Sequence, residues 1–99
     1  MSPNRSHDIA ADRIARKLGT EYNRGKGPDI KKPNMVVEVE TDQTVKDGLR
    51  QLQGFRKSVY IAGSNQKALN VALKTTKNTT VGVMDAWGKI VKRSSRKKR

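Results

Sequence analysis

Cysteine is absent from the 99 residues, and histidine occurs once, at His7. Disulfides, thiolate zinc sites, a cysteine nucleophile and a two-histidine metal site are therefore excluded. Aromatic side chains make up only 4% of the chain, which predicts a thin hydrophobic core. Acidic residues are also few, 9 against 22 Lys and Arg, and the net charge is +13. This surplus favours a polyanionic partner, with nucleic acid ahead of a membrane surface.

Long apolar runs are missing as well. No run approaches the roughly 20 residues needed to span a bilayer, and the start MSPNRSHD lacks the apolar stretch of a signal peptide. The sequence therefore predicts a soluble, cytoplasmic protein without a membrane partner. Its length predicts one domain, which we place at residues 1–91. The segment 92–99, KRSSRKKR, has no apolar residue and is predicted to be a disordered basic tail.

Periodic apolar residues and turn signals predict the secondary structure. Helices are expected over 7–18, 44–53 and a third segment that follows Ser64. Strands are expected around Tyr22, after Pro28, over 35–41 and 58–62, and in a closing hairpin with its turn at 85–88. The order α-β-β-β-α-β-α-β-β indicates an α/β (α+β) domain with a central mixed sheet flanked by helices. At the hairpin turn, Trp87 is expected to cover the core rather than stack on a base.

Acidic residues are concentrated in one part of this basic chain. Five of the nine fall within nineteen residues: Asp29, Glu38, Glu40, Asp42 and Asp47. Such a cluster hinders phosphate binding, so it indicates another purpose, and a divalent cation is the obvious one. The alternative is that these acids offset neighbouring lysines and cap a helix.

Strand alternation places Glu38 and Glu40 on one face of the strand that begins at Met35. If the segment from Asp29 pairs antiparallel to this strand, Asp29 lies beside the two glutamates. Two or three converging carboxylates can hold a cation for phosphodiester chemistry. As alternatives, Asp29 starts a turn or caps a strand, and the glutamates form the solvated face of an edge strand.

A basic loop precedes the acids. Arg24 and Lys26 are flanked by Gly25 and Gly27, and glycines let a backbone approach phosphate closely. We therefore expect this loop to contact substrate, although plain loop residues have the same composition. His7 has no identifiable partner in the sequence and is left unassigned.

One arrangement of residues resembles a known family. Pro28-Asp29, eight further residues, Glu38-Val39-Glu40 at the end of an apolar strand, and a following helix with Gln51 are similar to the core of the PD-(D/E)xK, or restriction-endonuclease-like, nuclease superfamily. The layout is closest to the small archaeal Holliday junction resolvases, whose first helix carries an acid that matches Asp8. The resemblance implies a restriction-endonuclease-like minimal core that binds Mg²⁺ (or Mn²⁺) through Asp29 and Glu38.

The chain departs from the family where Glu40 occupies the position of the motif lysine, which orients or activates water. Some restriction enzymes of the superfamily use a second glutamate here, as a base or metal ligand. Alternatively Lys46 or Arg50 supplies the cation, or the protein binds without cutting.

The leading hypothesis is a structure-directed, metal-dependent endonuclease that acts as a homodimer on junction or branched DNA, with RNA left open as a substrate. Its catalytic residues would be Asp29, Glu38, Glu40 and Asp8, the first three also binding the metal. Its phosphate contacts would be Arg24, Lys26, Lys31, Lys32, Lys46, Arg50 and the tail. The alternatives are a non-catalytic nucleic-acid-binding protein with a degenerate nuclease fold and an accessory subunit of a larger assembly.

Overall fold

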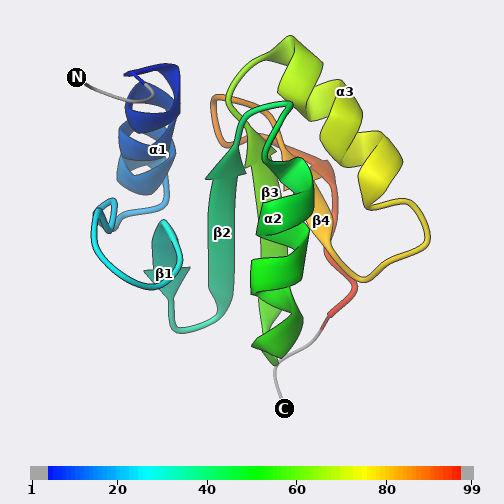
Figure 1. Ribbon diagram of the computed structural model, residues 1–99. Helices are drawn as coiled ribbons and strands as arrows, with labels where there is room; N and C mark the ends of the chain where they lie inside the picture. The colour runs from blue at the N-terminus through cyan, green and yellow to red at the C-terminus, as the bar shows by residue number, and fades with distance from the viewer. Residues whose placement is uncertain (1–4, 97–99) are drawn as a thin grey trace.

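A computed structural model describes residues 5–96, which form a five-stranded mixed sheet with helices on both faces (Figure 1). The elements are α1 (Arg5–Lys17), β1 (Ile30–Lys32), β2 (Met35–Glu40), α2 (Val45–Gln51) with the 3₁₀ turn η1 (Leu52–Gly54), β3 (Ser58–Gly63), α3 (Gln66–Thr75), β4 (Gly82–Met84) and β5 (Ile90–Lys92). The predicted α/β (α+β) class and mixed sheet are confirmed. The strand predicted around Tyr22 is wrong, because Asn23 instead organises a loop through hydrogen bonds to the backbone at Gly25, Lys26 and Pro28.

The strands are ordered β1-β2-β3-β4-β5 across the sheet. The three central strands are parallel, and the two outer ones are antiparallel to their neighbours. Parallel neighbours need a crossover connection, and α2 and α3 provide the two crossovers. The register places Glu38 beside Ile61 and Glu40 beside Gly63.

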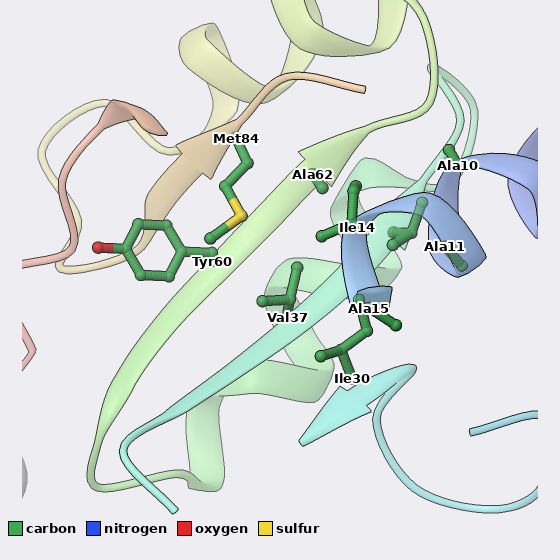
Figure 2. Packing of buried hydrophobic residues seen from close by; sticks show 10 residues of the cluster. Ala10, Ala11, Ile14, Ala15, Ile30, Val37, Tyr60, Ala62 and Met84 are labelled. Carbon is green, nitrogen blue, oxygen red and sulfur yellow. The ribbon is translucent and has the colours of Figure 1, made fainter. Parts of the chain in front are cut away.

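Two apolar clusters lie on opposite faces of the sheet. On one face α1 packs its small residues and Ile14 against Val37 and Ile30, as Figure 2 shows. On the other face α2 and α3 cover a cluster that includes Val36 and Ile61. Because Val36 and Val37 belong to different clusters, the alternation predicted for β2 is confirmed, and Glu38 and Glu40 face α2.

The C-terminal segment is attached to the domain, in contrast to the expected tail. Lys92 is the last residue of β5, and its Nζ donates to the carbonyl oxygens of Thr76 (2.6 Å) and Val81 (2.9 Å). Arg96 Nη1 donates to the carbonyl oxygen of Leu52 at 2.6 Å. Thr76 and Leu52 lie at helix ends, where carbonyl oxygens attract cations. These contacts order residues 92–96, and residues 97–99 lie outside the described range. Within residues 5–96, every helix is too short or too polar to cross a membrane.

Candidate metal centre

Strand β2 carries two carboxylates into a buried position. Glu38 is only 4% exposed and Glu40 7%, although both are ionisable. They are not the solvated face of an edge strand, because β1 and β3 flank β2 and α2 lies over this face. The fit under α2 depends on Gly48, since a Cβ there would lie 2.6 Å from Glu40 Oε2.

Asp29 joins the glutamates from the neighbouring strand edge. In the antiparallel register Ile30, the first residue of β1, pairs with Val37. No residue of β1 therefore lies opposite Val39. Asp29 Oδ2 takes the place of a strand carbonyl and accepts the Val39 N–H at 2.9 Å. One carboxylate oxygen from each of Asp29, Glu38 and Glu40 lies within 4.8 Å of the other two. The predicted convergence is confirmed, and these three residues form a cluster that could bind a metal ion, hereafter the acid cluster.

The charges in the acid cluster are poorly stabilised. Burial, followed by the negative charges of Asp29 and Glu40, raises the pKa of Glu38 to about 8. Burial is also the main cause that raises the pKa of Glu40 to about 7. Like charges in a desolvated site disfavour ionisation. A bound cation would relieve this repulsion, and oxygen-only ligands suit a hard divalent ion.

His7 is the functional neighbour that sequence analysis missed. Its Nε2 lies 3.3 Å from Asp29 Oδ2, so it does have a partner. The hydrogen bond to Asp29 is the largest cause that raises the pKa of His7 to about 9, and the imidazole is therefore protonated at neutral pH. Placed in the first turns of α1, it supports the acid cluster from the opposite side to α2.

Asp8 lies next to the acid cluster without belonging to it. Tyr22 Oη donates to Asp8 Oδ1 at 2.9 Å, and His7 Nδ1 lies 3.5 Å from the same oxygen. His7 thus stands between Asp8 and Asp29. The hydrogen bond from Tyr22 is the main cause that lowers the pKa of Asp8. The Asp8 carboxylate is therefore placed beside the His7 ring and outside the acid cluster.

The basic loop, which contains Arg24 and Lys26, folds back toward Asp8 and Tyr22. Arg24 lies over the Tyr22 ring, with its guanidinium carbon 4.7 Å from the ring centroid, and its Nη2 donates to Asp12 at 3.0 Å. Lys26 and Lys31 are exposed. By alternation along β1, Lys31 lies on the same face of the sheet as Glu38, and Lys32 lies on the face of α1.

The structure does not bring Lys46 or Arg50 to the acid cluster. Both are exposed on α2, and each lies two residues, or about 200° around the helix, from the inward-facing Gly48. Arg50 pairs instead with Asp47. Neither side chain can take the place of the motif lysine. Among the residues that the structure describes, His7 is the cationic side chain that contacts the acid cluster.

An open cleft leads to the acid cluster. Its volume is about 330 Å³, and its walls are Gly27, Pro28, Glu38, Gln51 and Phe55. One wall belongs to the basic loop, the other to the end of α2, and a carboxylate of the acid cluster lies between them. Gln51, expected from the resemblance, is thereby placed near the site.

Comparison with known proteins adds no relative. No family model, curated protein or solved structure matches the chain. The interpretation of the site therefore rests on its residues and their geometry.

Proposed function

We propose that this protein is a metal-dependent endonuclease that hydrolyses DNA phosphodiester bonds. The observation that carries the proposal is the convergence of Asp29, Glu38 and Glu40 within 4.8 Å, beside a cleft, in a chain of net charge +13. A buried group of acids opposes polyanion binding unless a cation neutralises it, and a divalent cation bound there serves both the fold and phosphate chemistry.

Asp29, Glu38 and Glu40 would hold Mg²⁺ or Mn²⁺ through carboxylate oxygens. Such an ion, when bound, neutralises charge that develops on the phosphate and lowers the pKa of a coordinated water. The protonated His7 fixes the orientation of Asp29 from behind. Where Glu40 does not bind the ion, its carboxylate can accept a proton from the attacking water.

The cleft indicates how DNA would be held. Lys26 is exposed in the loop that forms one wall of the cleft, and Lys31 is exposed on β1. Both would contact phosphates of the bound DNA. A single small domain offers little surface for reading bases, so we propose recognition of DNA shape, as in junctions or branched DNA. A homodimer would place two acid clusters on two strands.

The test measures metal binding and cleavage together. Purified protein is incubated with plasmid and with a four-way junction in Mg²⁺ or Mn²⁺, and thermal unfolding is followed with and without Mn²⁺. Asp29→Asn and Glu38→Gln should abolish cleavage and the Mn²⁺-dependent rise in Tm. Glu21→Gln, which neutralises an exposed acid outside the cluster, is the matched control and should change neither. Light scattering gives the oligomeric state.

A second candidate is a non-catalytic nucleic-acid-binding protein, favoured by the structural role of Asp29 as acceptor for Val39 N–H. DNA binding without cleavage, together with a Tm that Mn²⁺ does not change, would refute the nuclease and support this alternative.

A further inference from the structure

Trp87 is held at the surface by a rigid turn between β4 and β5. It is 66% exposed, so it does not cover the core as predicted. Asp85 Oδ1 accepts the N–H groups of Trp87 and Lys89, both at 2.9 Å. The turn also packs tightly on α1, because a Cβ on Gly88, whose φ is +81°, would lie 3.2 Å from Lys17 Cδ. The indole is therefore presented to solvent by a fixed backbone.

A cation orients the indole ring. The guanidinium carbon of Arg13 lies 3.8 Å from the Trp87 ring centroid. Stacking on one face in this way restrains the ring, while two thirds of the side chain stays accessible. A tryptophan held in one orientation at the surface offers an accessible aromatic face of the kind that is enriched at interfaces.

The surface next to Trp87 is basic. Ile9, Arg13 and Arg16 follow one another at helical spacing on the outer side of α1 and line, with Asp12, an open pocket of about 330 Å³. Asp12 is paired with Arg24 Nη2 at 3.0 Å, so its charge is offset. Ile9 is itself 50% exposed. We call Ile9, Arg13, Arg16 and Trp87 the Trp87 platform.

We propose that the Trp87 platform binds an unpaired nucleotide of a single-stranded segment, with the base stacked on the indole and the phosphate near Arg16. An aromatic face beside guanidinium groups is the arrangement that binds single strands without sequence preference. Charge complementarity favours this occupant, since the platform presents two arginines and the chain as a whole is strongly basic.

Most of the platform lies on the same helix as His7, which contacts Asp29 of the acid cluster. His7 and Arg13 are six residues apart in α1, which is about 9 Å along the helix axis. The two residues are also about 120° apart around the helix, so a strand bound at both places would have to curve around α1. The inference rests on the proposed nuclease function for its role, and it narrows the substrate to DNA that exposes unpaired bases next to a duplex, as branch points and frayed ends do.

Because Trp87 is the only tryptophan in the sequence, its fluorescence reports on this surface alone. We would titrate the protein with oligothymidylate and with a blunt duplex of equal length, in a chelator so that no cleavage occurs. Oligothymidylate should quench the indole emission, and the duplex should do so much less. By anisotropy of a labelled oligothymidylate, Trp87→Ala should bind about 5- to 150-fold more weakly, the loss of one stacked base. Trp87→Phe should retain most of the affinity.

Charge-matched variants separate the platform from general attraction to polyanions. Arg13→Gln and Arg16→Gln should weaken binding more than Lys74→Gln, which removes an exposed charge from α3 on the other face of the sheet. Glu38→Gln should quench as the wild type does, so the result does not depend on the acid cluster. Unchanged affinity in Trp87→Ala would overturn the proposal. So would a mass that falls from dimer to monomer in Trp87→Ala without loss of oligothymidylate affinity, because the platform would then be a self-association surface.

Discussion

Replacing Gly48 by alanine should separate the stability of the protein from the function of its acid cluster. Gly48 lies in the middle of α2 with helical backbone, where alanine is ordinarily favoured by about 1 kcal/mol. Its added Cβ would lie only 2.7 Å from Glu40 Cγ, whereas ordinary contacts begin at 3.4 Å. The Glu40 side chain would therefore have to retreat by about 0.7 Å.

The opposing contributions set the expected magnitude. Overpacking costs about 1–3 kcal/mol, so Gly48→Ala should lower the free energy of unfolding by between zero and about 2 kcal/mol after the helix gain of about 1 kcal/mol. In a Glu40→Ala background the obstacle is gone, and the same substitution should stabilise the protein by about 1 kcal/mol. Displacement of the carboxylate by nearly an ångström should also reduce cleavage, by up to about 100-fold.

Urea unfolding in a chelator measures the stability of the wild type, the two single variants and the double variant. Cleavage of a junction in Mn²⁺ measures the effect of Gly48→Ala on activity. The decisive quantity is the difference between the effect of Gly48→Ala with and without Glu40. An equal change in the two backgrounds would refute the claim that the glycine is there to make room for the carboxylate.

Two other predictions concern charge. In a chelator, Glu38 and Glu40 have folded pKa values of about 8 and 7, above their ordinary value of 4.5. Folding therefore takes up protons, and the urea midpoint should fall as the pH rises from about 4.5 to about 8. Mn²⁺ should restore the stability that is lost. A midpoint that rises over this pH range would contradict the direction of both pKa shifts. Lys92→Met keeps the alkyl stem but leaves the carbonyl oxygens of Thr76, at the end of α3, and of Val81, before β4, without their cation. It should lower the free energy of unfolding by about 1.5 kcal/mol. Lys89→Met in the same hairpin should cost almost nothing in the same urea assay.

The acid cluster could be predicted because its determinants are local. Alternation along β2 fixes the face of Glu38 and Glu40, and the short turn before Met35 brings Asp29 back beside them. Both are properties of one contiguous segment. The crossover helices and the closing hairpin could be predicted for the same reason.

The contacts that could not be predicted join distant parts of the chain. His7 meets Asp29 across 22 residues, a contact that depends on how α1 crosses the sheet. The order in 92–96 depends on carbonyls that Leu52 and Val81 present only in the folded state. The turn that exposes Trp87 packs through Gly88 on Lys17 and Ile14 of α1, which is again a contact between distant parts of the chain. The dipeptide His7-Asp8 next to a helix start was the one local signal for the missed histidine.

The order of the strands across the sheet, identical to their order along the chain, has a consequence for folding kinetics. Every pairing joins two strands that are consecutive in the sequence, so no connection has to pass over an intervening strand. The two parallel pairings still each close over a crossover helix, so folding is expected at the intermediate rates of mixed α/β domains. The sheet can grow outward from β2, α2 and β3, the unit that also buries Glu38 and Glu40. The repulsion between these carboxylates is therefore met early in folding rather than in the last step.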